Sequence, residues 1–339
     1  MNTKLKLCAA VLAATLTTTA SAGVVTEWSY QNQAGFTNWS GTTDTTTTGD
    51  DVIATGNSSV GAGENDLTVN SANIIDSNLD SVVNGDDLAL ATKLTWGTPA
   101  AGSGNPQSSL EIESPLTGNM ATNDSDFAAG TGLIHENWVV IGDTLQGGLV
   151  FDALALTPSA WNDEGDSTAE LEDPANNPYF APQLGFVMAF SETPNSQSGT
   201  CDIGDGEANG QGNNINGCGD VFALTIPVGA SGIVVGDNYL EFSVPFALKN
   251  AAGEDIAGWS DTQYMVTTRL SGLSVLSSEV SVCGPQDEFL CVGFVTIEQT
   301  TNELVAGFKI STVPEPTAIA LFGLGLIATG FAGRRRRSL

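Results

Sequence analysis

The stretch Leu304-Val305-Ala306-Gly307-Phe308-Lys309-Ile310-Ser311 places Leu304, Ala306, Phe308 and Ile310 on one face of an extended chain. Lys309 and Ser311 fall on the opposite face. Because successive side chains of a β-strand point to opposite sides, this period of two predicts a strand with one buried face. The same alternation recurs upstream, at residues 24–30, 88–96, 184–190, 222–226 and 240–244.

Clusters of Gly, Asn, Asp, Ser and Pro separate these segments and predict long loops, at 99–106, 158–182, 194–219 and 227–238. A threonine-rich polar stretch at 41–51 predicts a further loop. No convincing helical period of 3.6 residues occurs between residues 23 and 312. The sequence therefore predicts an all-β protein, an antiparallel β-sandwich with long acidic loops, as one domain or two lobes.

The first 22 residues have the features of a signal peptide. Lys4 and Lys6 precede an apolar run at 7–16, and the small residues Ala20-Ser21-Ala22 follow. A charged start, a short apolar core and a small-residue cleavage site are typical of export signals. We expect signal peptidase to cleave here, so that the mature chain begins at Gly23.

Residues 313–339 have the features of a membrane segment. Val313-Pro314-Glu315-Pro316 precedes the uncharged, glycine-rich stretch 317–333, and four arginines follow, Arg334, Arg335, Arg336 and Arg337. Seventeen helical residues span ~25 Å, just short of the hydrocarbon core of a bilayer. Basic residues beside a span stay on the cytoplasmic side. We therefore expect a transmembrane helix that anchors the precursor in the inner membrane, with residues 23–312 on the far side.

The proline-glutamate-proline motif, the apolar span and the arginine cluster together resemble the PEP-CTERM sorting signal of Gram-negative bacteria. In proteins with this signal, a membrane protease-transferase called an exosortase removes the tail. The resemblance implies export, processing and delivery to the cell surface or extracellular matrix, often alongside exopolysaccharide production.

Residues 23–312 are strongly acidic. Of the ten basic and 39 acidic residues in the chain, six arginines and lysines and Glu315 lie in the two ends, so four basic and 38 acidic residues remain. This surplus excludes nucleic acid as a partner, because a phosphate backbone would be repelled. It favours solubility and loose association with divalent cations. The acidic loops 161–182 and 199–220 lack EF-hand spacing, and we predict no metal site and no cofactor, with calcium binding by these loops left open.

Four cysteines remain once Cys8 leaves with the signal peptide: Cys201, Cys218, Cys283 and Cys291. An even number in an exported chain predicts disulfides, and proximity favours Cys201–Cys218 and Cys283–Cys291 among the three possible connectivities. A zinc site is disfavoured, because there is no Cys-x-x-Cys pair and only one histidine.

That histidine, His135, lies in the alternating stretch Gly132-Leu133-Ile134-His135-Glu136-Asn137. In a strand, His135 and Asn137 share a face, whereas Glu136 points the other way. A catalytic histidine needs a nucleophile or base partner, and none is evident. We therefore predict a structural role, with the ring against apolar neighbours and Asn137 as its hydrogen-bond partner.

The chain also resembles the THxN family of PEP-CTERM proteins, whose Thr-His-x-Asn signature corresponds to Ile134-His135-Glu136-Asn137, with isoleucine in the threonine position. Similar family segments are found at 94–97 and 106–110, at Phe190-Ser191-Glu192-Thr193-Pro194-Asn195, at Cys218-Gly219-Asp220-Val221-Phe222, at 291–294 and at 307–311. The resemblance covers most of residues 88–312 and brings no known activity.

Three functions compete on these observations. The first is an exported, non-enzymatic β-sandwich at the cell surface or in an exopolysaccharide matrix, which we favour. The alternative is a carbohydrate-binding module that stacks sugars on Trp28, Trp39, Trp138, Trp161 or Trp259. A hydrolase ranks last, since the sequence offers no nucleophile elbow and no carboxylate pair at a defined separation. We thus predict no catalytic residues.

Overall fold

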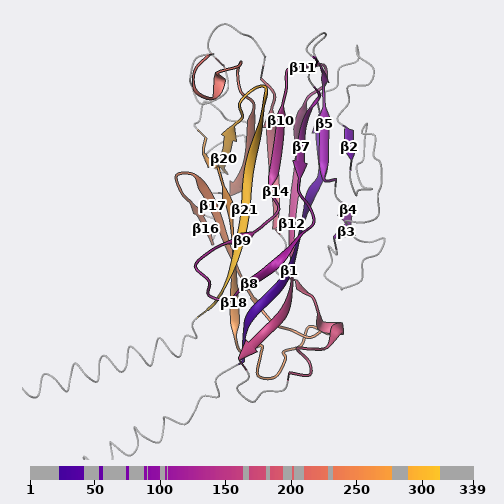
Figure 1. Cartoon of the computed structure of the whole chain (residues 1–339), viewed down its shortest axis with the longest axis vertical. Coiled ribbons are helices and arrows are strands. Elements are labelled where there is room, and N and C mark those ends of the chain that lie inside the picture. The colour runs from indigo at the N-terminus through magenta and orange to yellow at the C-terminus, as the bar shows by residue number, and fades with distance from the viewer. Residues whose placement is uncertain are drawn as a thin grey trace, which may run out of the picture.

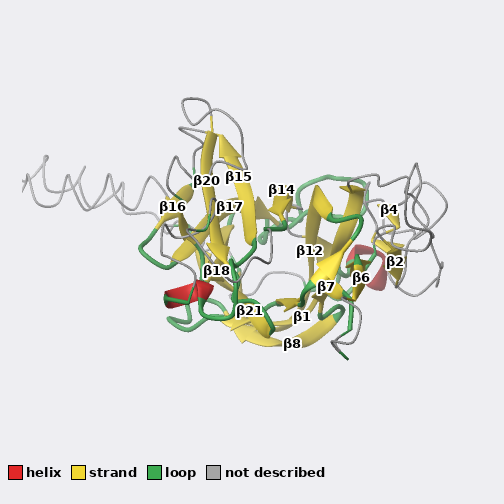
Figure 2. Cartoon of the chain, turned by 90° about the horizontal axis from the view of Figure 1, so that it is seen from above, coloured by secondary structure: helices red, strands yellow, loops and turns green. Residues whose placement is uncertain are grey.

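The computed structural model describes residues 23–41, 53–55, 74–75, 88–89, 91–99, 104, 106–162, 168–180, 184–193, 201, 210–227, 232–276 and 289–313. The regular secondary structure of these residues is almost entirely β-strand, arranged in an elongated body (Figure 1). Seen along the long axis, two short 3₁₀ helices lie at the periphery (Figure 2), η1 (Pro174–Asn176) and η2 (Gly212–Asn214). The predicted all-β class is confirmed for the described residues.

One sheet has eight strands in the order β19-β20-β15-β14-β12-β1-β8, with β13 paired to β12. All of its pairings are antiparallel. Its strands are β1 (Val24–Gly41), β8 (Leu116–Ala121), β12 (Leu145–Asn162), β13 (Tyr179–Phe180), β14 (Leu184–Ser191), β15 (Val221–Pro227), β19 (Ser274–Val275) and β20 (Phe289–Val295).

The other large sheet has nine strands in the order β16-β17-β18-β21-β10-β7-β5-β2, with β9 paired to β21. Its strands are β2 (Ile53–Thr55), β5 (Lys93–Trp96), β7 (Ser108–Ile112), β9 (Ala128–Ala129), β10 (Leu133–Asn137), β16 (Ile233–Val235), β17 (Tyr239–Ala247), β18 (Gln263–Ser271) and β21 (Thr300–Thr312). The described residues also form two small two-stranded sheets. In one, β11 (Val140–Ile141) pairs with β6 (Thr98–Pro99), and in the other, β3 (Ile74–Ile75) pairs with β4 (Leu88–Ala89).

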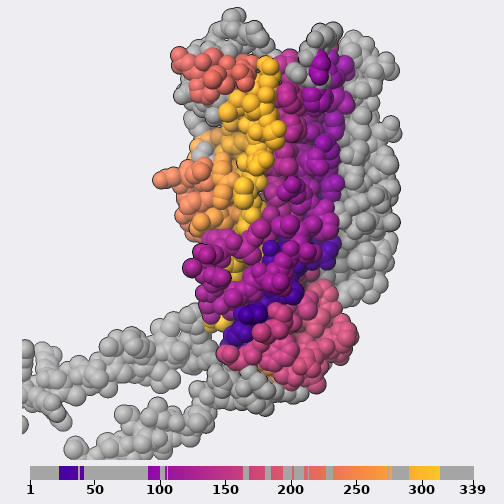
Figure 3. Space-filling model, in the orientation of Figure 1, coloured from indigo at the N-terminus to yellow at the C-terminus, as the bar shows by residue number. Residues whose placement is uncertain are grey.

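The period-two prediction for β21 is confirmed. Leu304, Ala306, Phe308 and Ile310 are buried, whereas Val305 is exposed. The strand is visible in yellow along the upper part of the face drawn in Figure 3, beside purple and magenta residues of the first half of the chain. β10 lies next to it, with His135 opposite Asn302.

The predicted loops 158–182 and 227–238 contain strand residues. Residues 158–162 belong to β12, which pairs with β1 in a ladder that extends from Val24↔Asn162 to Gly41↔Leu145. Residues 233–235 form β16 inside a predicted loop. In both cases the gain from cross-strand pairing with a long neighbour outweighs local preferences for turns.

The apolar core has two main parts. One lies between the sheets, where Phe36, Phe190 and Phe222 of the eight-stranded sheet meet Leu110 and Leu240 of the other. The second surrounds Trp28, Trp259 and Tyr264. Both ends of the described chain lie near this second part, because Gly23 bonds to Gly258 and Val313 bonds to Gln263 through their backbones.

The predicted signal peptide and transmembrane tail lie outside the described residues. Within the described ranges, no helix is long and apolar enough to cross a membrane.

Candidate functional site

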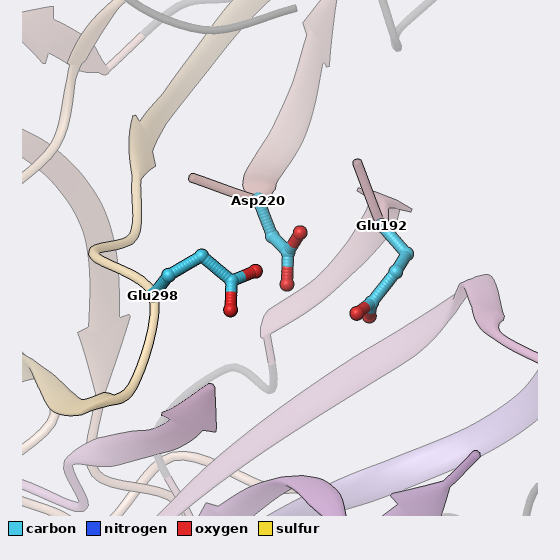
Figure 4. A group of neighbouring side chains, drawn as sticks. All are labelled: Glu192, Asp220 and Glu298. Atoms are coloured by element: carbon cyan, nitrogen blue, oxygen red, sulfur yellow. The ribbon is translucent and has the colours of Figure 1, made fainter. Parts of the chain in front are cut away.

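Three carboxylate side chains meet at the end of the sandwich that is opposite the chain ends. Glu192 follows β14 directly, Asp220 precedes β15, and Glu298 lies in the turn between β20 and β21. They extend from three separate segments into one space (Figure 4), and one oxygen of each lies within 4.8 Å of the others. Asp220 and Glu298 are 0% exposed, and Glu192 is partly buried with its Oε1 atom enclosed.

Hydrogen bonds fix the first two carboxylates in place. Trp96 on β5 donates its Nε1–H to Glu192 Oε2 at 2.8 Å. The backbone N–H of Thr193 donates to Asp220 Oδ1 at 2.8 Å, and the Thr193 hydroxyl donates to the carbonyl of Cys218 at 2.6 Å. Each sheet therefore contributes contacts to the cluster.

Asn137 brings the end of β10 into the same site. This residue is 0% exposed, its Nδ2 donates to Thr296 Oγ1 at 3.0 Å, and its amide hydrogen-bonds the Glu298 carboxyl. Thr296 in turn donates to the backbone carbonyl of Asp220. The Asn137 Oδ1 atom has no hydrogen-bond partner among the described residues.

Burial makes ionisation of these carboxyls unfavourable. Desolvation and the neighbouring Glu192 raise the pKa of Glu298 to about 8, against a smaller lowering by Asn137. Desolvation, Glu192 and Glu298 raise the pKa of Asp220 well above its usual range, and desolvation also raises the pKa of Glu192. Burial and mutual repulsion therefore disfavour the ionised form of all three carboxyls unless a cation is bound among them.

No basic side chain of residues 23–312 neutralises the cluster. The four that exist there are bound elsewhere: Lys93 to Glu111, Lys249 to Asp255, Arg269 to Glu241, and Lys309 over the ring of Phe127. The lone histidine is not positively charged either, because burial lowers the pKa of His135 to about 3.

His135 lies between aromatic rings, stacked on Trp96 at 5.7 Å between centroids and edge-on to Phe190 at 5.2 Å. It is 0% exposed, so the expected burial among apolar neighbours is confirmed. The predicted partner is wrong, however. Asn137 bonds to Thr296 instead, and neither ring nitrogen of His135 has a partner among the described residues. Side chains at i and i+2 of a strand point the same way without converging.

The predicted disulfide Cys201–Cys218 is present, with the Cα atoms 5.4 Å apart. It ties the loop after β14 to the segment that carries Asp220. Cys291 is also disulfide-bonded, but Cys283 lies outside the described residues, so the second predicted pairing stays a prediction.

Sequence reasoning found only part of this site. Segments quoted for the THxN resemblance contain Trp96, Asn137, Glu192 and Asp220, yet no joint role followed from them. Glu298 was missed altogether. The three carboxylates are separated by 28 and 78 residues in the sequence, so no short motif indicates that they lie together.

The tryptophans proposed as a sugar platform do not form one. Trp28, Trp39 and Trp259 are buried in the core, and Trp161 is half-buried with its ring edge-on to Trp259. Trp138 is half-buried as well. The sixth tryptophan, Trp96, is the buried donor to Glu192.

The sorting tail begins where the fold ends. β21 ends at Thr312, and Val313 is the last described residue, so Pro314–Pro316 and Arg334–Arg337 lie outside the described part. A family model, the PEP-CTERM protein-sorting motif, matches residues 312–337. A search of curated proteins found no match to the chain. The chain thus carries a PEP-CTERM sorting motif at its C-terminal end, which implies an exported protein that an exosortase targets.

Proposed function

We propose that residues 23–312 form a non-enzymatic protein of the cell surface or exopolysaccharide matrix, of the THxN group of PEP-CTERM proteins. In this proposal, signal peptidase removes residues 1–22, residues 313–339 hold the precursor in the inner membrane, and an exosortase then releases it. The observation that carries the proposal is the sorting motif that directly follows β21, the central strand of a folded β body.

The chemistry of the described residues also favours a non-catalytic role. His135 is enclosed between aromatic rings and stays neutral, so it is poorly suited to proton transfer with a substrate. Asp220 and Glu298 are 0% exposed, which prevents a substrate from reaching both carboxyls as glycoside hydrolysis requires.

Intact mass spectrometry tests this proposal. Protein recovered from outside wild-type cells is expected to begin near Gly23 and to lack the residues after about Pro316. Cells without the exosortase are expected to retain the uncleaved tail in the inner membrane. Full-length protein in the inner membrane of wild-type cells would contradict the proposal.

The carbohydrate-binding alternative has a candidate sugar site that does not involve the tryptophans. A pocket of about 360 Å³ lies beside η1, and its lining combines aromatic and polar side chains: Tyr179, Phe246, Asn176, Asn250 and Lys249. Such a mixture suits a sugar. A glycan array probed with wild type and with Asn250→Ala tests this alternative. Glycan binding that Asn250→Ala abolishes would favour it over the purely structural role.

A further inference from the structure

We propose that Glu192, Asp220, Glu298 and Asn137 form a calcium-binding site that joins the two sheets at the end of the sandwich distant from the sorting tail. Calcium ions are the proposed ligand, bound through carboxylate oxygens and the Asn137 amide oxygen. This inference does not depend on the proposed function.

The first support is the charge of the site. Buried carboxylates in proteins are paired with a cation, bound to a metal or protonated. All four lysines and arginines of residues 23–312 contact other groups. A metal ion is therefore the way in which these carboxylates can stay ionised in a buried site.

The second support is the geometry. Calcium lies 2.3–2.6 Å from its oxygen ligands, so two ligands on opposite sides of one ion are about 4.8 Å apart. The three carboxylates offer oxygens that all lie within that distance of one another. One ion can thus contact all three without a large movement of the backbone.

The third support is a buried amide beside the carboxylates. Asn137 is fully buried, and its amide contacts Glu298, yet its Oδ1 atom has no partner among the described residues. A buried amide oxygen without a donor loses the hydrogen bond that it would make in water. An ion within the cluster would give this oxygen a partner.

The donor set selects calcium over the other common cations. All the available donors are oxygens, whereas zinc prefers nitrogen and sulfur. Carboxylates bind calcium through one or both oxygens, so three of them with an amide can supply up to seven oxygens, within the range of six to eight ligands that calcium takes. Magnesium retains several waters in a strict octahedron, for which a largely buried site leaves little room.

The position of the site indicates what the ion would do. Glu192 and Asp220 flank strands of the eight-stranded sheet, and Asn137 ends a strand of the nine-stranded sheet. Glu298 lies in the turn that connects the two. β21 separates this end from the sorting tail by thirteen residues, ~43 Å at 3.3 Å each. Bound calcium would hold together the end of the protein that lies away from the sorting tail.

Thermal melting of the full chain in detergent micelles tests the proposal, first in EGTA and then in CaCl₂. Wild type is expected to melt ~5 °C higher once calcium exceeds its dissociation constant a hundredfold. Glu298→Gln and Asp220→Asn keep the side-chain shape and remove one charge each, so both are expected to fold and to lose this response. Asp152→Asn is the matched control, the same kind of change at a half-buried carboxyl outside the cluster, and it should keep the response.

Terbium luminescence locates the ion. The Trp96 indole donates to Glu192, so excitation of tryptophan should sensitise terbium bound in the cluster, and calcium should displace it. One displaceable ion per chain, absent in Glu298→Gln, would support the site. Equal calcium responses in wild type and both cluster variants would assign binding to the acidic surface and overturn the proposal, as would no response in wild type.

Discussion

Replacement of His135 by alanine and by leucine separates a structural histidine from a functional one. The imidazole is fully buried, contacts the rings of Trp96 and Phe190, and makes no hydrogen bond with the described residues. Alanine removes the ring and leaves a cavity. Leucine fills a similar volume with an apolar side chain and also removes the two buried nitrogens.

The expected magnitudes follow from these contacts. Two aromatic contacts contribute ~0.5–1.5 kcal/mol each beyond burial, and the cavity adds to the loss. Removal of the two buried ring nitrogens, which have no hydrogen-bond partner among the described residues, offsets part of this loss of stability, by ~1–3 kcal/mol. We therefore expect His135→Ala to reduce the free energy of unfolding by ~1–3 kcal/mol, and His135→Leu to change it by less than ~1 kcal/mol.

Urea unfolding at pH 7.5 in EGTA measures both effects while the histidine is neutral in the folded and unfolded states. If His135→Leu lost as much stability as His135→Ala, the ring nitrogens would have partners that matter, and the structural interpretation of His135 would be refuted. A second wild-type series in calcium provides the comparison for the cation-bound state.

Three further predictions concern covalent links and pH. The double variant Cys201→Ser, Cys218→Ser opens a loop of 17 residues in sequence separation and should lower the free energy of unfolding by ~3 kcal/mol, measured by urea unfolding; an unchanged midpoint would contradict it. Non-reducing peptide mapping should recover Cys283 linked to Cys291, and a free thiol at either residue would show that pairing to be wrong. Desolvation raises the pKa of Asp152 to about 6, although a hydrogen bond donated by Asn32 lowers it in part. The protonated carboxyl therefore contributes to the free energy of unfolding below about pH 4, and this contribution to stability is lost as the pH rises through 6. Because Asp152 retains some exposure, Asp152→Asn should gain only ~1–2 kcal/mol at pH 7.5 and should flatten the melting temperature between pH 4 and 6; a loss of stability at pH 7.5 would refute this.

The strands that could be predicted are those with one apolar and one polar face. β21 alternates clearly because its inner face packs in the core and its outer face meets solvent. β12 was missed, since Gly147, Gly148 and Pro158 interrupt the pattern and much of the strand is only half-buried. Its stability comes from the ladder with β1, which no single segment of the sequence reveals.

The candidate site could be predicted only in pieces. The Cys201–Cys218 bond follows from sequence proximity, and the burial of His135 follows from its strand face. The meeting of Glu192, Asp220 and Glu298 depends instead on the order of strands in the sheets, which places the end of β14, the start of β15 and the β20–β21 turn together. The partner of Asn137 comes from that turn and not from its own strand.

A crystal structure of the protein grown with calcium tests the cation site most directly. We predict one strong density peak among the three carboxylates, with oxygens of Glu192, Asp220, Glu298 and Asn137 at 2.3–2.6 Å from it. Carboxyls that instead contact one another through shared protons, with no peak between them in calcium, would contradict the site.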